Sequence, residues 1–296
     1  MAESLISDRE SLLKRAAVLR ITTVSLASAM QSGAFRSLYR GQGIEFSGVR
    51  EYLRGDDVRA IDWNVTARFS KPYVKVFNEE RELQIFLIID RSLSMQEGAK
   101  NKSRLEAATE IAALLTLSAE RNSNPVGAVF FSGGIEFAIQ PKNSQNQTLL
   151  LLSRLDEQPT ASKGTALAES LNGAGKLLKK RSLVFVISDF RAGGWEDALA
   201  RLAARHDVVA TRITDSVDSS LPEIGTVVVR DPESGERRLF PTMSKTFRSE
   251  WREDAAMRSK RWTDSVLRRG GIPLSISTSE DALSALMAFF SQREIA

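Results

Sequence analysis

The pattern of apolar and polar residues along the chain predicts three parts. Residues 8–30 place apolar side chains close to one helical stripe, which predicts an N-terminal helix within residues 1–31. From residue 32 to residue 82, short alternating runs are broken by glycine and proline, which predicts a small, charged, β-rich subdomain. From residue 83 to residue 296, strand-length apolar runs alternate with helical patterns, which predicts an α/β domain with a doubly wound, mostly parallel sheet.

The third part has a regular order of expected elements. The expected strands are Leu83–Ile89, Gly127–Phe131, Leu183–Ser188, Val208–Ile213 and Pro273–Ile276. The expected helices are Ser103–Arg121, Ala166–Lys179, Trp195–Ala204, Lys245–Arg269 and Glu280–Gln292. A hairpin insertion is expected near residues 225–240, where two β-type runs flank a Pro- and Gly-containing turn, and the polar segment Lys142–Gln147 is expected to be a loop.

Oxygen-bearing side chains follow the expected strands at their carboxyl ends. Asp90, Ser92 and Ser94 form a D-x-S-x-S pattern directly after the first strand of the sheet. Thr165 stands at the start of an expected helix, and Asp189 follows another expected strand. Because ligands of doubly wound sheets bind outside the carboxyl ends of the strands, these five residues are candidates for one site. The alternative is that the two serines only cap an ordinary turn.

This set resembles the metal-ion-dependent adhesion site of von Willebrand factor type A domains. The resemblance implies that Asp90, Ser92, Ser94, Thr165 and Asp189 surround one divalent cation. Mg²⁺ suits oxygen ligands and retains water, with Mn²⁺ or Ca²⁺ as alternatives. Two carboxylates and uncharged hydroxyls leave the metal incompletely neutralised, so that it can accept an acidic side chain from a partner protein. We therefore expect a docking site and no enzymatic activity.

A longer resemblance includes the segment before the sheet domain. The chain is similar to the bacterial family called domain of unknown function 58, a branch of the type A superfamily, in Ser32–Ser37, Arg40–Phe46, Arg50–Tyr52, Gly55–Arg59, Ile61–Trp63, Thr66–Arg68 and Glu79–Arg81. The resemblance implies a partnership with a MoxR-type AAA+ ATPase, and an adaptor role in remodelling of client complexes or in inserting a metal or cofactor into them. Many relatives begin with membrane-spanning helices, whereas no such segment is visible here, which leaves peripheral association with membrane proteins.

Composition narrows the chemistry further. The chain has 296 residues, one His and no Cys, which excludes disulfides, Cys-ligated zinc and thiol catalysis. No apolar stretch has the length of a membrane span, and no signal peptide is recognisable, so a cytoplasmic location is expected. A metal-dependent phosphohydrolase with Asp90 as nucleophile is a competing hypothesis. Ser92 counts against it, because the haloacid-dehalogenase type needs a second Asp there as acid/base.

The charges point to two surfaces. The formal net charge is +4, and the expected basic helix 245–269 carries the excess. Apolar residues recur in this helix at helical spacing, so we expect them to pack on the sheet and expect no nucleic-acid binding, which stays the alternative for its basic face. In residues 32–82, positive and negative residues nearly balance. Tyr52 and Trp63 are expected to be buried anchors there. The arginines of this segment are expected to be either structural or recognition residues.

Overall fold

The computed structural model describes residues 42–53, 56–69, 71–78, 83–98, 102–159, 164–230 and 236–292. The predicted N-terminal helix within residues 1–31 lies outside these residues. The chain forms two compact units, one built around Leu83–Phe289 and the other around Ala29–Glu82, and each is described here by itself.

The smaller unit is built on a two-stranded antiparallel sheet. Strand β1 (Gln42–Glu51) pairs with β2 (Tyr73–Asn78), and the short 3-10 helix η1 (Val58–Ala60) and helix α3 (Trp63–Phe69) lie between them in the chain. The prediction that Trp63 is a buried anchor is wrong, because its side chain is 67% exposed. The physical reason is size: α3 has seven residues and no buried side chain, so this part of the chain has too small a core to enclose an indole ring.

The ion pairs between described residues of the smaller unit join Arg50 to Asp56, Lys71 to Glu51 and Lys75 to Asp62. Arg50 donates through both terminal nitrogens to Asp56, at 2.7 Å each. These hydrogen bonds, with one from a backbone amide, lower the pKa of the Asp56 carboxyl to about 2. Because the side chains of Arg50 and Asp56 are 46% and 21% exposed, water screens the pair and its contribution to stability is small.

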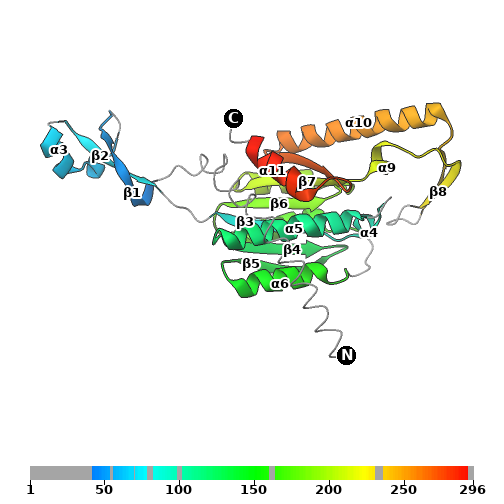
Figure 1. The fold of residues 1–296 in the computed structure, drawn as a ribbon, viewed down its shortest axis with the longest axis horizontal. Helices are drawn as coiled ribbons and strands as arrows, with labels where there is room; N and C mark the ends of the chain where they lie inside the picture. The colour runs from blue at the N-terminus through cyan, green and yellow to red at the C-terminus, as the bar shows by residue number, and fades with distance from the viewer. Residues whose placement is uncertain are drawn as a thin grey trace, which may run out of the picture. The chain divides into compact units, whose positions relative to one another are not determined.

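The larger unit contains a six-stranded sheet with the order β10-β7-β6-β3-β4-β5 (Figure 1). Its strands are β3 (Gln84–Asp90), β4 (Val126–Phe131), β5 (Ile135–Lys142), β6 (Ser182–Ser188), β7 (Asp207–Thr214) and β10 (Ile272–Ser277). All neighbouring strands are parallel except β4 and β5, which are antiparallel. The predicted doubly wound, mostly parallel sheet is therefore confirmed. From β3 the chain adds β4 and β5 on one side of the sheet, and it then adds β6, β7 and β10 on the other side of β3. The topological switch point of the sheet therefore lies between β3 and β6.

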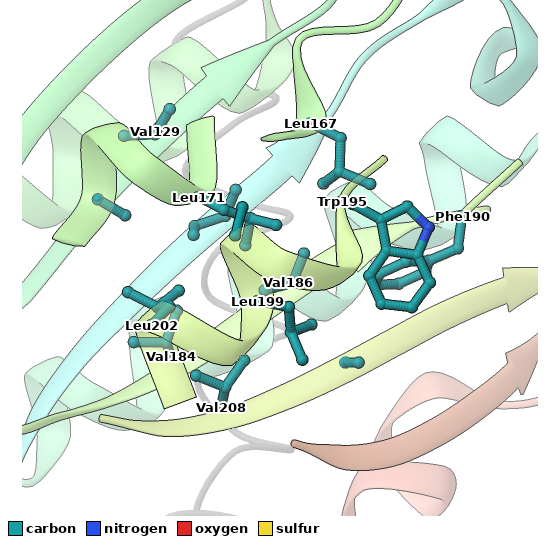
Figure 2. Packing of buried hydrophobic residues seen from close by; sticks show 14 of the residues in the cluster. Val129, Leu167, Leu171, Val184, Val186, Phe190, Trp195, Leu199, Leu202 and Val208 are labelled. Atoms are coloured by element: carbon teal, nitrogen blue, oxygen red, sulfur yellow. The ribbon is translucent and has the colours of Figure 1, made fainter. Parts of the chain in front are cut away.

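Helices cover both faces of the sheet. They are α4 (Leu93–Gln96), α5 (Arg104–Arg121), α6 (Gln145–Asp156), α7 (Leu167–Leu177), α8 (Glu196–Ala203), α9 (Ser216–Ser219), α10 (Lys245–Arg268) and α11 (Ala282–Gln292). On one face, Leu171 of α7 and Leu199 of α8 pack against Val184, Val186 and Val208 of the sheet (Figure 2). Helix α5 contributes no residue to that cluster, contacts β3, β4 and β7, and covers the opposite face.

The predicted elements of this unit agree with the structure within about two residues at each end, and the structure adds four elements that the sequence does not predict. They are strand β5, helix α6 and the short helices α4 and α9. The predicted loop Lys142–Gln147 is wrong in part, because β5 continues to Lys142 and α6 begins at Gln145. No residue of β5 is fully buried, since it is an edge strand, and its apolar signal in the sequence is correspondingly weak.

The predicted hairpin insertion is present. Strands β8 (Thr226–Arg230) and β9 (Arg237–Pro241) pair antiparallel, and Phe240 of β9 packs on the rings of Phe247 and Trp251 in α10. The predicted inward-facing stripe of α10 also agrees, since Trp262 and Val266 are its buried residues. Among the helices of the described residues, none combines the length and the apolar character needed to cross a membrane.

Candidate metal centre

The D-x-S-x-S residues converge where β3 ends. The sheet continues one residue past β3, because the Arg91 amide donates to the carbonyl of Phe131 at 2.7 Å. The chain then turns, and Asp90 Oδ1 accepts a hydrogen bond from the Ser92 amide at 2.9 Å. The hydroxyl oxygens of Ser92 and Ser94 lie 3.2 Å apart. All three of these predicted site residues are buried, so the turn holds three oxygen-bearing side chains out of bulk water.

The neighbouring strand β6 brings a hydroxyl group that the sequence reading missed. Strands β3 and β6 are parallel with Ile89 opposite Ile187, so Asp90 and Ser188 end the two strands side by side. The Ser188 hydroxyl donates to Asp90 Oδ2 at 2.6 Å and accepts from the Phe190 amide at 3.0 Å. The sequence does carry a signal for this residue, because a serine occupies the last position of β6, directly before Asp189. Ser188 therefore fixes the orientation of the Asp90 carboxylate.

The Asp189 carboxylate is the fourth predicted oxygen donor at this place. It is buried, and Oδ1 accepts a hydrogen bond from the Arg191 amide at 3.1 Å. Oδ2 accepts no hydrogen bond from any residue that the structure describes, although Arg191 Nε lies 3.5 Å from it. A buried carboxylate oxygen without a hydrogen bond is costly, and a cation is one way to satisfy it.

Thr165, the fifth predicted ligand, stands apart from the other four in its contacts. Its side chain is exposed, and no hydrogen bond in the described ranges links it to Asp90, Ser92, Ser94 or Asp189. The next residue is held near the end of β4, because the Ala166 amide donates to the carbonyl of Ser132 at 2.7 Å. The structure thus brings together four of the five predicted residues and leaves the role of Thr165 as a prediction.

The electrostatics of this cluster fit a hard divalent cation. Burial, and secondarily the charge of Asp189, raise the pKa of Asp90 to about 6, while hydrogen bonds from Ser188 and Ser92 oppose the shift. Two carboxylates and two hydroxyls supply only oxygen, which is the donor type that Mg²⁺ prefers. Across the described part of the chain no group of three or more His, Cys, Asp or Glu could hold a metal, so hydroxyl groups would have to complete any site here.

The raised pKa of Asp90 predicts a pH dependence of stability in the metal-free protein. The ordinary pKa is 3.8 and the folded value is about 6, so the folded state holds the proton more tightly than the unfolded state. Stability from this group is therefore greatest below about pH 4, falls as the pH rises towards 6, and changes little above that. A pKa of Asp90 raised from 3.8 to about 6 corresponds to roughly 3 kcal/mol.

Chemical unfolding in EDTA between pH 4 and pH 7 measures this effect. The free energies of unfolding of the wild type and of Asp90→Asn should separate progressively between about pH 4 and pH 6 and then stay apart, because only the wild type carries the titrating group. A difference that does not vary with pH would contradict the assignment of the raised pKa to Asp90.

The fold and the cluster around Asp90 together define the class of protein. It is a doubly wound α/β protein with a cluster of oxygen-bearing side chains at the switch point of its sheet. Residues 48–261 match the family described as Protein of unknown function DUF58. The match covers well over half of the 296 residues, and the chain belongs to this family.

Relatives of this chain occur in mycobacteria. The uncharacterized protein Rv1480 of Mycobacterium tuberculosis is 29% identical over 286 residues, which cover 95% of this chain and 90% of that protein. The uncharacterized protein Mb1516 of Mycobacterium bovis has the same identity and coverage. The uncharacterized protein MAV169 of Mycobacterium avium is 27% identical over 158 residues, which cover 52% of this chain and 93% of that protein.

Two solved structures are also similar in chain path. One is the conserved hypothetical protein BatB from Bacteroides thetaiotaomicron, with a TM-score of 0.46 and 20% identity, covering 72% of this chain and 100% of that chain. The other is the SpRpn10 VWA domain, with a TM-score of 0.39 and 16% identity, covering 70% of this chain and 94% of that chain.

Proposed function

We propose that this protein is a non-enzymatic, Mg²⁺-dependent interaction protein that works as an adaptor. The observation that carries the proposal is the convergence of Asp90, Ser92, Ser94 and Asp189 at the ends of two parallel strands. Among the described residues, one oxygen of Asp189 accepts no hydrogen bond. Thr165 is the fifth proposed ligand. When bound, Mg²⁺ would supply a coordination position for an acidic side chain of the partner, with Mn²⁺ or Ca²⁺ as alternative ions.

The hydrogen bonds of Asp90 support binding rather than catalysis. Oδ1 accepts from the Ser92 amide and Oδ2 from the Ser188 hydroxyl, and only 2% of the residue is exposed. Oδ1 thus holds the turn and Oδ2 is held by β6, and each oxygen keeps a second lone pair that a small cation or its bound water can use. A carboxylate that attacks a phosphate must instead present an oxygen to a bulky substrate. Ser92 also supplies no carboxylic acid for proton transfer to a leaving group. These features favour the adaptor over the phosphohydrolase.

The aromatic residues of α10 support a packing role rather than nucleic-acid binding. The Trp251 indole donates to the carbonyl of Val217 at 3.0 Å, and Arg258 lies over its ring at 5.2 Å. Trp262 is buried, and Arg212 lies over its ring at 5.5 Å. Trp251 also packs on the ring of Phe240, so both indoles are engaged in contacts within the protein. We keep the prediction that the basic helix 245–269 binds no nucleic acid.

Two arguments support the proposed partner, one from the charge of the metal site and one from the family resemblance. Incomplete neutralisation of the metal by two carboxylates supports an acidic contact residue on a protein. The family resemblance supports a MoxR-type AAA+ ATPase as that protein, acting on a client complex in the cytoplasm or at the surface of membrane proteins. The adaptor would then present the ATPase with its client in a Mg²⁺-dependent manner.

Ser92→Ala tests the proposed function. Loss of this buried hydroxyl is expected to weaken Mg²⁺ binding by about 10- to 100-fold and to abolish Mg²⁺-dependent retention of the partner. Mg²⁺ affinity is measured by calorimetry, and retention is measured with the purified MoxR-type ATPase of the same organism, in Mg²⁺ and in EDTA.

Ser249→Ala is the matched control, because Ser249 is an exposed serine on α10. It should behave like the wild type in both measurements. Equal Mg²⁺ affinity of Ser92→Ala and wild type, or equal retention in Mg²⁺ and EDTA, would overturn the proposal.

A further inference from the structure

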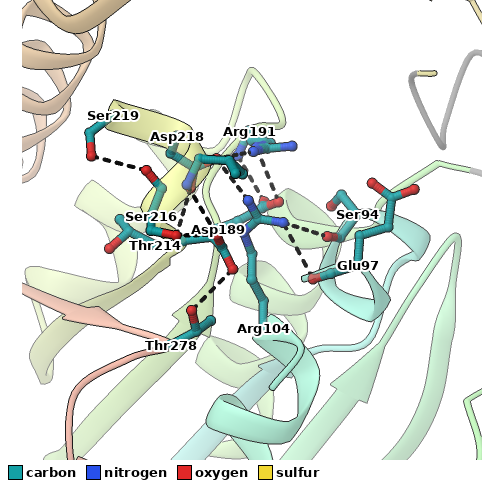
Figure 3. A network of polar contacts seen from close by, with 12 residues as sticks. Ser94, Glu97, Arg104, Asp189, Arg191, Thr214, Ser216, Asp218, Ser219 and Thr278 are labelled. Carbon is teal, nitrogen blue, oxygen red and sulfur yellow. Dashed lines mark hydrogen bonds and ion pairs between the residues drawn. The ribbon is translucent and has the colours of Figure 1, made fainter. Parts of the chain in front are cut away.

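Two arginines approach the candidate metal centre, although positive charge opposes cation binding. Arg104 comes from α5, is buried, and donates to the Ser94 carbonyl at 3.3 Å (Figure 3). Arg191 follows β6, is about half exposed, and has its Nε 3.5 Å from Asp189 Oδ2. Each guanidinium carries a fixed positive charge, and in a partly buried setting that charge would weaken the binding of a divalent cation nearby.

Asp218 of α9 engages both arginines. Its Oδ1 accepts from Arg104 Nη2 at 2.7 Å and from Arg191 Nη2 at 2.6 Å, as Figure 3 shows. The contact of Arg191 with Asp218 is thus nearly 1 Å shorter than its contact with Asp189 Oδ2. The close partner of Arg191 is therefore Asp218, and Asp189 keeps an oxygen without a hydrogen bond in the part of the chain described.

The position of Asp218 is fixed by the elements around it. Its Oδ2 accepts from the Asp215 amide at 2.8 Å, which completes the capping box of α9. Asp215 is buried and its Oδ2 accepts from the Thr278 hydroxyl at 3.0 Å, which ties α9 to the residue after β10. On the other side, Arg258 of α10 donates to the Asp218 carbonyl at 3.5 Å. Asp218 is held against β10 and α10 and cannot easily follow Arg191 if that side chain moves.

We infer that Asp218 is a positioning residue of the metal centre: by binding Arg191 and Arg104 it keeps the Asp189 carboxylate available to a cation. The inference rests on the proposed function. Asp218 places one negative charge against the two guanidiniums, in a setting where Arg212 and Arg258 add further positive charge. Without Asp218 that negative charge is lost, and Arg191 is free to form its close contact with Asp189 instead.

Four proteins test the inference by calorimetric Mg²⁺ titration: wild type, Asp218→Asn, Arg191→Gln and the double variant. Asp218→Asn should bind Mg²⁺ at least about tenfold more weakly, since Arg191 turns to Asp189. Arg191→Gln should bind at least as tightly as wild type. The double variant should regain most of the lost affinity, because the competing guanidinium is gone. A purely structural role of Asp218 in α9 would give no such recovery.

Asp281→Asn is the matched control, because Asp281 accepts a backbone hydrogen bond from Ser284 at 2.8 Å at the start of another helix of the chain. It should leave Mg²⁺ affinity unchanged, and thermal unfolding should show that every variant is folded. If wild type binds Mg²⁺ and Asp218→Asn binds it equally well, or if the double variant stays as weak as Asp218→Asn, the inference fails while the proposed function stands. If wild type binds no Mg²⁺, the proposed function fails and the inference fails with it.

Discussion

Asp90→Asn is expected to abolish Mg²⁺ binding and, in the same variant, to stabilise the metal-free protein. Mg²⁺ affinity should fall by at least about 100-fold, because the substitution removes one of two carboxylates and leaves a neutral amide. At pH 7 the free energy of unfolding without metal should rise by about 3 kcal/mol, since burial and the charge of Asp189 make an ionised Asp90 unfavourable there. The asparagine retains Oδ1 as acceptor for the Ser92 amide. Opposite signs in the two measurements are expected of a site that buries an ionised carboxylate beside a second one, an arrangement that a bound cation would stabilise.

The measurements for this variant are calorimetry for Mg²⁺ and chemical unfolding in EDTA for stability. Asp254→Asn on the exposed surface of α10 is the control, and it should change neither quantity beyond about 0.5 kcal/mol. If Asp90→Asn retains wild-type Mg²⁺ affinity, Asp90 is not a ligand of the metal. If it is less stable than wild type at pH 7, the hydrogen bonds of Asp90 outweigh the cost of burying its charge beside Asp189.

Gly127→Ala is expected to lower the free energy of unfolding by about 3 kcal/mol and the melting temperature by roughly 8 °C. Gly127 lies in β4, where the pairing with β5 shifts register. A methyl group there would come within 2.6 Å of the Pro141 nitrogen, 2.7 Å of the Ile139 oxygen and 2.8 Å of the Gln140 carbonyl carbon. All three atoms are backbone atoms, which cannot swing aside as a side chain does, so β5 must move away from β4. The loss should appear in both thermal and chemical unfolding.

Gly175→Ala is the matched control for the glycine substitution. A methyl group on Gly175 in α7 would meet Leu202 Cδ1 at 3.7 Å, which is ordinary van der Waals contact. Alanine also favours the helix, so this variant should be as stable as wild type or more stable by up to about 1 kcal/mol. If Gly127→Ala is as stable as Gly175→Ala, the backbone of β5 does not lie as close to β4 as the structure has it.

Much of the larger unit could be read from the sequence because its signals are local. The strand β3 is a continuous apolar run, and α5 begins with Ser103 and Glu106, which form a capping box. The candidate site could be predicted as far as it follows the ends of buried strands, since the carboxyl ends of parallel strands meet at one edge. For this reason Asp90 and Asp189 are found together although they lie far apart in the chain.

The remaining parts of the site could not be predicted because they depend on contacts between distant segments. Arg104 and Asp218 are separated by 114 positions, and nothing in either local sequence marks them as a pair. Ser188 resembles any hydroxyl residue at a strand end until its hydrogen bond to Asp90 is seen. The exposure of Trp63 could not be predicted either, because a large apolar ring is usually buried. Whether it is buried depends on the size of the surrounding core, and helix α3 buries no side chain.

The sequence alone determined the class of fold, the order of most strands and helices, and the oxygen-only chemistry of the candidate site. It could do so because apolar periodicity is a local property, and because a chain with one His and no Cys has little else with which to hold a metal. The tertiary structure alone decided which charges meet there: it buries Asp90 and places it beside Asp189, which together raise the pKa of Asp90, and it brings Asp218 to both Arg191 and Arg104. Burial and distance set the strength of these interactions, and both are fixed only when strands and helices far apart in the chain pack together.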